Sequence, residues 1–473
     1  MASPPHFVVI PLPVYGHIFP MLHLSVQLAS IGNKITFIAS TRTKTTTLST
    51  FESSLSQIQD PQTVRTNLIF EFLSGDELLQ QGGEQGFRAS LDWMVSQITA
   101  VDEAIESCVS RHGPVSCVIL DFMVFFLKNA AADKRNATVA ALWTASAPWM
   151  LLSLQIQALI DGGYVPLTPS NALSVVSGLT GVPPLCNYKD VPVCLLKPVT
   201  DQQIEEIAVI SKMFLEVPWL LVNTIPELDS RSLRCVRQLG VKSVAIGPLL
   251  PLPVKDSCRA PDDVPVLSWL DQKPPQSVVF ICFGTLAENT LEQLQELASA
   301  LEELTNQSFL WVLRPSQQSC LSEDFKRRTA ARGKIVPWCS QLQVLSHPSI
   351  GGFVTHCGWN SILESLSCGV PMLGWPCLGE QSLNSKYLAD VWKAGTRIVP
   401  YNPDGSNRVV NRSEVSKEIA LLMTGEEGQE LRKRARAIQK ASTRAMQSSV
   451  DELRRWIAQL FQQGEEASVE EQV

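Results

Sequence analysis

The stretch Trp338–Gln381 decides the fold of this chain: WCSQLQVLSHPSIGGFVTHCGWNSILESLSCGVPMLGWPCLGEQ. Within it, Ile350–Thr355 is a short apolar run with a bias to β-branched residues, which predicts a buried strand. The turn after that strand contains Gly358, which is free to adopt a positive φ.

Helical spacing begins at Asn360, so Asn360 or Ser361 is the expected N-cap, with Glu364 placed to complete a capping box. A second short strand, Pro371–Leu373, follows. A helix that begins at the carboxyl end of a buried strand presents unpaired N–H groups and the positive end of its dipole. The stretch therefore predicts a strand–turn–helix site for a nucleotide phosphate.

This stretch resembles the signature box of plant secondary-product glycosyltransferases, which move a sugar from a UDP-sugar to a small acceptor. The matching residues are Trp338, Gln341, Leu345, His347, Gly351, Phe353, His356, Cys357, Gly358, Trp359, Asn360, Ser361, Glu364, Gly369, Val370, Pro371, Pro376, Glu380 and Gln381. Ser340 stands where the family usually has proline. The resemblance implies an α/β fold of the GT-B type, with two Rossmann-like doubly wound domains facing each other across a cleft.

The resemblance also implies roles for residues of the box. The tryptophan at its start would stack on uracil, the glutamine and the first glutamate would bind the nucleoside, and the helix start would bind the diphosphate. Glu380 and Gln381, with Trp359, would face the sugar, and Gln381 is the form associated with glucose donors. The complete donor set is Thr285, Trp338, Cys339, Gln341, His356, Gly358, Trp359, Asn360, Ser361, Glu364, Glu380 and Gln381. Outside this context, a core or surface position is the favoured interpretation of Trp338. Glu364 could also be a helix cap, and the two roles are compatible.

His17 is the candidate catalytic base. It follows the first predicted strand, and imidazole can remove a hydroxyl proton near neutral pH. A lone histidine is more often a surface or helix-cap residue, but the Gly16-His17-x-x-Pro20 context resembles the family's catalytic histidine. Asp121, at the end of a buried strand, would bond the other ring nitrogen and hold the tautomer; its alternative role is a helix N-cap.

Two further observations concern the donor. Thr285 lies in a Phe283-Gly284-Thr285 context that resembles the family's phosphate-contacting loop, although it could be a plain turn residue. The sequence has no D-x-D motif, which argues against the metal-dependent class of glycosyltransferases, so no metal is expected. No cofactor is expected either: the UDP-sugar, with UDP-glucose favoured, is a co-substrate. A nicotinamide site is disfavoured because the first turn lacks the dinucleotide glycine fingerprint.

Composition limits the partners. The net charge of −7 argues against broad binding to nucleic acid or anionic membranes. The 12 cysteines include no C-x-x-C pair, which favours buried, reduced thiols in a cytosolic protein. The N-terminus has no signal-peptide pattern, and no window of about 20 residues is apolar enough for a membrane span. These features predict a cytoplasmic protein. The family resemblance implies a small acceptor and a UDP-sugar as partners, and we expect a monomer.

The length of 473 residues allows two domains with sizeable cores. We expect an acceptor domain over residues 1–248, a proline-rich linker over 249–265 and a donor domain over 266–444. The family resemblance places a C-terminal helix, about 445–463, back on the first domain. Expected strands include His6–Leu12, Ser116–Leu120, Thr138–Trp143, Trp219–Val222 and Val278–Phe283; expected helices include Phe19–Ser30, Ala89–His112 and Pro226–Leu239. Pro166–Pro198 is expected to be a surface excursion, and Gln80–Gly86 a loop.

The sequence does not identify the acceptor. Trp93, Phe122 and Thr144 are its candidate contacts, and an aromatic wall would suit a flat phenolic such as a flavonoid; these aromatic residues could equally be core. The expected reaction is a single inverting displacement that gives a β-glycoside. Two alternatives stay open: the same donor chemistry with a carbon or sulfur nucleophile, and a UDP-sugar-binding protein without turnover.

Overall fold

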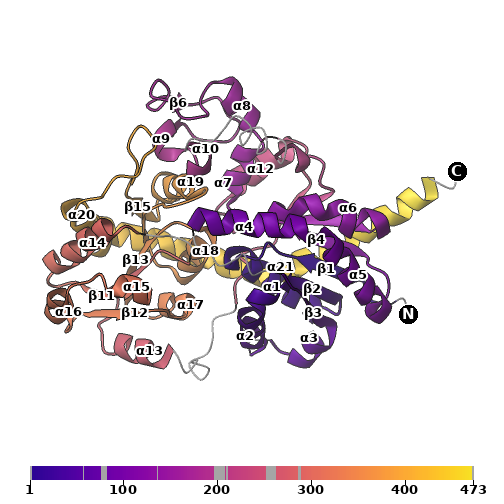
Figure 1. Ribbon diagram of the computed structural model, residues 1–473, viewed down its shortest axis with the longest axis horizontal. Helices are drawn as coiled ribbons and strands as arrows, with labels where there is room; N and C mark the ends of the chain where they lie inside the picture. Colours follow the sequence, from indigo (N-terminus) through magenta and orange to yellow (C-terminus); the bar gives the residue numbers. More distant parts are fainter. Residues whose placement is uncertain are drawn as a thin grey trace. The chain divides into compact units, whose positions relative to one another are not determined.

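The computed structural model describes residues 3–56, 58–75, 83–135, 137–196, 208, 211–251, 263–285 and 289–470. The chain forms two α/β units (Figure 1). Unit 1 comprises Met1–Met150, Lys212–Leu252 and Thr443–Val473, and unit 2 comprises Leu151–Ser211 and Pro253–Ser442. The segment 151–211, which the sequence assigned to the first domain, thus groups with the second. Most of the predicted linker, residues 252–262, lies outside the described residues.

Unit 1 is built on a parallel sheet that has seven strands within the described residues. In spatial order the strands are β3 (Leu68–Leu73), β2 (Lys34–Ser40), β1 (His6–Ile10), β4 (Cys117–Asp121), β5 (Thr138–Trp143), β8 (Trp219–Val222) and β9 (Ser243–Ala245). The chain order reverses direction between β1 and β4, which pair in the register Ile10↔Leu120. In open α/β sheets this switch point is where ligands bind, outside the carboxyl ends of the strands.

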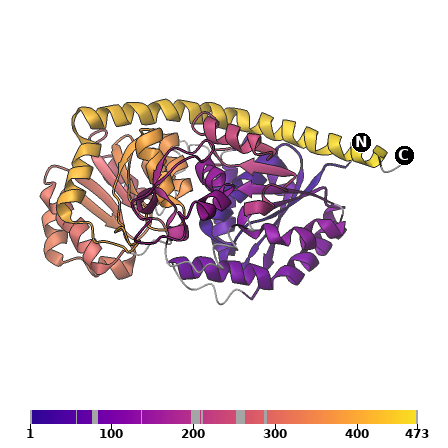
Figure 2. The ribbon, with the colours of Figure 1, turned by 90° about the horizontal axis from the view of Figure 1, so that it is seen from above.

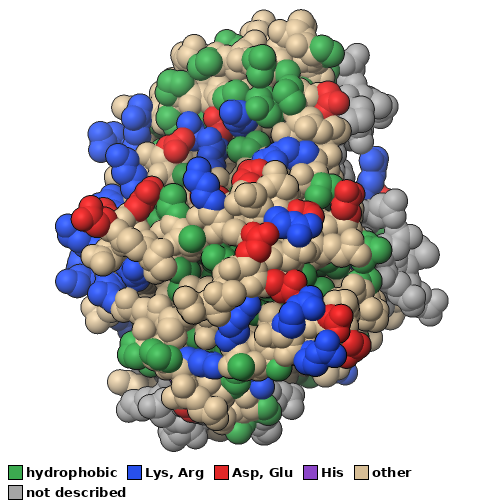
Figure 3. All heavy atoms as spheres, turned by 90° about the vertical axis from the view of Figure 1, so that its left-hand side faces the viewer, with side chains coloured by type: hydrophobic (Ala, Val, Ile, Leu, Met, Phe, Trp, Pro, Cys, Tyr) green, Lys and Arg blue, Asp and Glu red, His purple; other side chains and the backbone are tan. Residues whose placement is uncertain are grey.

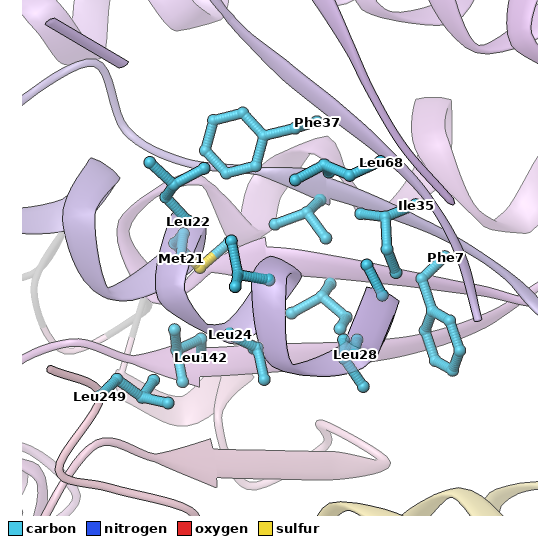
Figure 4. Close-up of a cluster of buried hydrophobic side chains, with 14 of the residues drawn as sticks. Phe7, Met21, Leu22, Leu24, Leu28, Ile35, Phe37, Leu68, Leu142 and Leu249 are labelled. Atoms are coloured by element: carbon cyan, nitrogen blue, oxygen red, sulfur yellow. The ribbon is translucent and has the colours of Figure 1, made fainter. Parts of the chain in front are cut away.

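The core of unit 1 forms where helix α1 (Tyr15–Ser30) covers this sheet. Met21, Leu22, Leu24 and Leu28 of α1 lie near the strand residues Phe7, Ile35 and Phe37 in Figure 4, and all belong to one buried cluster. The other helices of unit 1 are η1 (Thr41–Thr43), α2 (Lys44–Leu55), α3 (Pro61–Asn67), α4 (Gly83–Ser96), α5 (Ile98–His112), η2 (Phe122–Leu127), α6 (Lys128–Ala131), η3 (Asp133–Arg135), α7 (Ala147–Ser153) and α12 (Ser230–Gln238). Helix α7 ends just beyond the boundary with unit 2.

Unit 2 repeats the plan with a parallel sheet that has six strands within the described residues. Their spatial order is β12 (Gly333–Val336), β11 (Ser308–Val312), β10 (Val278–Cys282), β13 (Ile350–Thr355), β14 (Met372–Gly374) and β15 (Gly395–Arg397). The switch point here lies between β10 and β13, where Cys282 pairs with Thr355. The helices are α8 (Ile156–Asp161), α9 (Asn187–Asp190), α10 (Val193–Leu196), α13 (Val264–Leu270), α14 (Leu291–Glu303), α15 (Pro315–Gln318), α16 (Glu323–Thr329), α17 (Gln341–Leu345), α18 (Trp359–Cys368), α19 (Gln381–Lys386), the π-helical turn η6 (Tyr387–Val391) and α20 (Arg412–Met423).

Several predicted element boundaries are wrong. The helix predicted over Ala89–His112 is two helices, α4 and α5, which meet at the non-helical residue Gln97. The first helix begins at Tyr15 rather than Phe19, because the N–H groups of His17 and Ile18 both bond the carbonyl oxygen of Val14 ahead of Pro20. Of the predicted loop over 80–86, residues 80–82 lie outside the described residues, and Gly83 already begins α4.

The described part of the proline-rich segment predicted as a surface excursion, residues 166–196, contains regular elements and buried contacts. It contains a small hairpin, β6 (Val175–Val176) and β7 (Leu185–Cys186), and its helix α9 packs against α19. Asp190, only 1% exposed, accepts hydrogen bonds from Nη1 of Arg397 at 2.5 Å and from the backbone N–H of Cys186 at 2.7 Å. Nζ of Lys386 lies 3.7 Å from the same carboxylate. This buried ion-pair cluster fastens the segment to the rest of unit 2.

Helix α21 (Gly425–Glu470) is one long helix, drawn in yellow in Figure 2. Its residues Leu453, Trp456 and Leu460 belong to the buried core of unit 1, and the Trp456 ring lies 5.9 Å from that of Phe7. In the described part of the chain, no helix combines the length and apolar character needed to cross a membrane.

Charged side chains on the face in Figure 3 lie interspersed over most of the surface, with acidic and basic groups side by side. Helix α16 of unit 2 has such pairs at helical spacing: Lys326 with Glu323 at 2.7 Å, and Arg327 with Asp324 at 2.5 Å. Pairing of opposite charges weakens the field that each would otherwise extend into solvent.

Candidate active site

The switch point of unit 1 brings His17 and Asp121 together. His17 lies in the first turn of α1, after β1, and Asp121 is the last residue of the neighbouring strand β4. Nδ1 of His17 lies 2.8 Å from Oδ2 of Asp121. The carboxylate is fully buried whereas the imidazole is 16% exposed, so the histidine is the member of the pair that a solute can reach.

Thr144 joins this pair from the end of β5. Its hydroxyl donates to Oδ2 of Asp121 at 3.1 Å and lies 3.0 Å from Nδ1 of His17. The structure therefore places Thr144, predicted as an acceptor contact, within hydrogen-bond distance of both catalytic candidates. Its 5% exposure makes it mainly a partner of the carboxylate.

Asp121 also has the role that the sequence offered as its alternative. Its Oδ1 accepts from the backbone N–H of Met123 at 2.9 Å, so it caps the short helix η2. The two roles use different oxygens of one carboxylate: Oδ1 bonds the backbone, and Oδ2 bonds His17 and Thr144. The cap fixes the orientation of the carboxylate toward the imidazole.

The aromatic candidates around this site are mostly core residues. Phe122 stacks on His17 with ring centroids 5.8 Å apart and packs on Trp143 at 4.2 Å, and it is 6% exposed. Trp93 is 5% exposed, and its indole N–H donates to the carbonyl oxygen of Gly75 at 3.0 Å. Phe122 is thus an aromatic side chain in contact with the histidine.

The turn between β13 and α18 forms the switch point of unit 2, but its backbone differs from the prediction. Gly358 has φ −61, and the positive φ of 65 belongs to Cys357. Glycine is required at 358 for a different reason: a Cβ there would lie 2.3 Å from Nε2 of His356. A Cβ on Gly284, at the end of neighbouring β10, would lie 2.8 Å from the same ring. Two glycines therefore make room for the imidazole of His356.

His356 has a different environment from His17. Its ring lies next to backbone on both sides, and in the described residues its buried Nδ1 has no hydrogen-bond partner. Burial lowers the pKa of His356 from 6.5 to about 4. The imidazole is therefore neutral at physiological pH and can donate one hydrogen bond without carrying charge.

Helix α18 begins at Trp359 with Gly358 as its N-cap, so the predicted capping box is wrong. Gly358 has no side chain that could accept from the first turn, and that turn contains no acidic residue. The ten-residue helix thus directs its N-terminal dipole at the His356 turn without a built-in anion. This is the arrangement that favours a bound phosphate.

Glu364 forms a polar cluster with Gln341 and Ser361 instead of capping the helix. Nε2 of Gln341 donates to Oε2 of Glu364 at 2.8 Å and to Oγ of Ser361 at 2.9 Å. Burial raises the pKa of Glu364 to about 7, and the Gln341 hydrogen bond opposes that rise. The carboxyl group can thus change its protonation state near neutral pH.

The two tryptophans of the box have opposite environments. Trp338 is 61% exposed, as a stacking platform for a base would be, and the next residue, Cys339, is buried. Burial raises the pKa of the Cys339 thiol far above its usual range, so this thiol is not a reactive thiolate. Trp359 is 4% exposed, and its ring centroid lies 5.9 Å from that of Trp392, so most of its side chain is buried; its predicted position facing the sugar stays a prediction.

Gln381 is the first residue of α19, and Glu380 is its N-cap. Oε1 of Gln381 accepts from the backbone N–H groups of Cys377 and Leu378, both at 2.8 Å, which leaves its amide nitrogen for other contacts. Oε1 of Glu380 accepts from Nδ2 of Asn384 at 3.2 Å. The sequence reading missed Asn384, although its position four residues after Glu380 places it on the same helix face.

Thr285 and Asn360 complete the predicted set. Thr285 is exposed in the turn after β10, and its carbonyl oxygen accepts from Nη2 of Arg314 at 2.6 Å. Asn360 lies in the first turn of α18 and is half-buried. Over the residues that the structure covers, no three His, Cys, Asp or Glu side chains form a group able to hold a metal ion.

Comparison with known proteins adds a family to this geometry. Residues 253–400 match the family model described as UDP-glucoronosyl and UDP-glucosyl transferase. The chain is 32% identical to 7-deoxyloganetin glucosyltransferase from Catharanthus roseus, over 91% of this chain and 90% of that protein. It is 30% identical to mogroside I-E synthase from Siraitia grosvenorii, over 90% and 91% of the two chains.

Solved structures agree with these sequence matches. UGT2 of Phytolacca americana, complexed with UDP-2-fluoro-glucose and pterostilbene, superposes with a TM-score of 0.79 at 25% identity, covering 96% of this chain and 99% of that one. A UDP-glucosyltransferase from Polygonum tinctorium, capable of glucosylating indoxyl, gives a TM-score of 0.80 at 25% identity, covering 97% and 99%.

Proposed function

Because this chain belongs to the UDP-glucoronosyl and UDP-glucosyl transferase family, we propose that it transfers glucose from UDP-glucose to a hydroxyl group of a small apolar acceptor, with inversion at the anomeric carbon. The family makes it a UDP-glycosyltransferase with two Rossmann-like domains of the GT-B type. The sugar, the acceptor and the roles of individual residues are the proposal. The observation that carries it is the hydrogen-bonded cluster of His17, Asp121 and Thr144.

His17 acts as the general base. With the Nδ1 proton donated to Asp121, neutral imidazole has its lone pair on Nε2. As the acceptor oxygen attacks the anomeric carbon, its proton passes to Nε2, and the buried Asp121 carboxylate stabilises the imidazolium that forms. The new carbon–oxygen bond forms on the face opposite the leaving UDP, so the α-linked donor gives a β-glucoside.

The UDP leaving group is stabilised in unit 2 without a positively charged histidine. The bond from the anomeric carbon to the β-phosphate oxygen breaks, and negative charge develops on the diphosphate. The uncapped N-terminus of α18 and an N–H donor from neutral His356 are the groups that meet this charge. Trp338 would stack on uracil, and Glu364 would accept hydrogen bonds from the ribose hydroxyls.

Two observations favour glucose and an apolar acceptor. Two of the relatives have glucosyltransferase in their names, and in this chain the Gln381 amide nitrogen and Glu380 would supply a donor and an acceptor for sugar hydroxyls. Phe122 stacks on His17, so an aromatic surface adjoins the base. Together with the pterostilbene bound by UGT2, this supports a flavonoid or other phenolic acceptor.

The test is to incubate the wild type and His17→Ala with UDP-glucose and a panel of phenols, and to measure UDP binding by calorimetry. Loss of the base should lower kcat by about 10²- to 10⁴-fold. The affinity for UDP should not change, because His17 belongs to a different unit from the donor residues. The product's anomeric configuration is read by NMR.

Each alternative gives a distinct result. An α-glucoside would rule out the single displacement. A product that resists acid hydrolysis would indicate attachment through carbon, and transfer only to thiol acceptors would indicate a sulfur nucleophile. UDP binding without transfer to any acceptor would favour the non-catalytic binding protein.

A further inference from the structure

The side chain of Asn384 connects two parts of the donor site in unit 2. It lies in α19, is completely buried, and its Nδ2 has two acceptors. One is the carbonyl oxygen of Cys357, at 3.0 Å, in the turn before α18. The other is Oε1 of Glu380, at 3.2 Å, at the start of α19. An asparagine amide has two N–H groups, so it can donate to both acceptors at once.

The contact with Cys357 restrains an unfavourable backbone conformation. Cys357 has φ 65, a conformation that is unfavourable for any residue with a Cβ. Such a conformation persists only where neighbouring groups hold it in place. Its thiol packs closely against the backbone of Gly374, where an added Cβ would lie only 2.7 Å from Sγ. Asn384 holds the same residue from its carbonyl side. The two contacts together fix the turn.

Fixing this carbonyl also fixes the start of α18. The carbonyl of Cys357 and the N–H of Gly358 belong to one planar peptide group and point in opposite directions. The hydrogen bond from Asn384 therefore sets the direction of the Gly358 N–H as well as the path of the backbone past His356. Under the proposed function, this is the backbone that meets the diphosphate.

The contact with Glu380 concerns the sugar. A carboxylate that accepts from a buried amide loses rotational freedom and keeps one oxygen in place. We propose that Asn384 is a positioning residue that holds the diphosphate-binding turn and the sugar-facing carboxylate in one fixed arrangement. This inference rests on the proposed function, and it adds a residue that touches neither the substrate nor the reacting atoms.

Asn384→Asp is the sharpest variant, because it keeps the shape and replaces the donor by an acceptor. An aspartate would direct an oxygen at the carbonyl of Cys357 and at the Glu380 carboxylate, and would repel both. Asn384→Ala removes the donor without adding charge. It provides the same test if the aspartate variant does not fold. Asn306→Asp, an exposed asparagine of the same unit, makes the same chemical change away from the site and should behave as wild type.

The readouts are the Kd of UDP, which lacks the sugar and reports on the turn, and kcat/KM for UDP-glucose. Asn384→Ala should weaken UDP by about tenfold. It should lower kcat/KM by about 10²-fold, since a small misplacement of reacting groups has an effect of that size. In Glu380→Gln the carboxylate that Asn384 holds is absent. Adding Asn384→Ala to that variant should therefore lower kcat/KM by no more than it lowers the affinity for UDP.

Two outcomes would overturn the proposal. One is additive losses from Asn384→Ala and Glu380→Gln in kcat/KM; the other is unchanged UDP affinity in a folded Asn384 variant. Failure of the proposed function looks different. If the wild type binds UDP but transfers no glucose, that function is wrong, while the UDP affinities of wild type and Asn384→Ala still decide whether Asn384 holds the turn.

Discussion

The switch points of the two sheets have the same strand geometry and different chemistry. In unit 1 the segment after the first strand, β1, carries His17, and the adjacent β4 ends in the carboxylate of Asp121. In unit 2 the segment after the first strand, β10, carries Gly284, and the adjacent β13 is followed by His356. One histidine thus meets a carboxylate, and the other meets a glycine.

Under the proposed function, this difference suits the two histidines to different tasks. A buried carboxylate at 2.8 Å stabilises the protonated form of His17, which a general base must reach during the reaction. His356 has no such partner among the described residues, and burial lowers its pKa to about 4. The two histidines follow different strands of their switch points, β1 for His17 and β13 for His356. Under the proposed function, the histidine in unit 1 is suited to accept a proton and the histidine in unit 2 to remain neutral.

Of the substitutions that test this comparison, Asp121→Asn should cause the largest loss of kcat. The amide keeps the shape but no longer stabilises imidazolium and can favour the wrong tautomer, so kcat should fall by about 10⁴-fold, as in a hydrolase triad. Thr144→Val removes one hydrogen-bond donor to Oδ2 of Asp121 and should lower kcat by only about tenfold. Steady-state kinetics with UDP-glucose measure both. Equal losses in the two variants would contradict the assignment of the carboxylate as the main partner.

Gly358→Ala tests the close approach in unit 2. The new Cβ would lie 2.3 Å from Nε2 of His356, so the ring or the helix start must move. Because φ at this position is −61, backbone strain is not the cause of any loss. We expect kcat/KM for UDP-glucose to fall by about 10²-fold, with the melting temperature little changed. Wild-type kinetics would mean that the position of His356 does not matter.

Trp338→Ala tests whether the exposed indole binds the base. Stacking of a base on an aromatic ring contributes about 1–3 kcal/mol, so UDP affinity should fall by about 5- to 150-fold. Trp338→Phe should retain most of the affinity, since it keeps an aromatic face. The affinity for UDP is measured by calorimetry. An alanine variant that binds UDP as tightly as the wild type would show that Trp338 is an ordinary surface residue.

The smallest effect we expect is a pH dependence of the affinity for UDP, caused by titration of Glu364. Ribose hydroxyls donate to the ionised carboxylate, so affinity should decrease as pH falls below about 7, by at most tenfold per pH unit. Stability responds in the opposite sense. The folded-state pKa lies above the usual value, so ionisation lowers the free energy of unfolding of the free enzyme as pH rises from about 4.5 through about 7. Glu364→Gln should flatten both profiles; an unchanged slope would contradict this role.

The sequence predicted strands better than it predicted side-chain environments. Thr138–Trp143, Trp219–Val222 and Ile350–Thr355 have the predicted bounds, because buried parallel strands are continuous apolar runs. The break between α4 and α5 was missed, since neither glycine nor proline marks Gln97.

Within the site, the residue types were predictable and their exposure was not. Trp338 and Trp359 belong to the same motif, yet one is 61% exposed and the other 4%. One contact of the buried ring is with Trp392, a residue distant in sequence whose ring centroid lies 5.9 Å away. Likewise, the positive φ at Cys357 could not be assigned from sequence, because the neighbours that hold it, Asn384 and Gly374, come from later elements.

The buried cluster around Asp190 has a consequence for enzyme engineering by recombination. Chimeras of related transferases are most simply made by exchanging everything before the sequence midpoint. In this protein, a crossover near residue 252 would separate Leu151–Ser211 from the unit in which it packs. Asp190 would then face whatever residue the other parent has in place of Arg397. Removing one member of a buried ion pair costs about 3–5 kcal/mol. The piece to exchange is therefore discontinuous: residues up to 150, 212–252 and the end of α21 form one interchangeable part, and residues 151–211 must travel with the donor half.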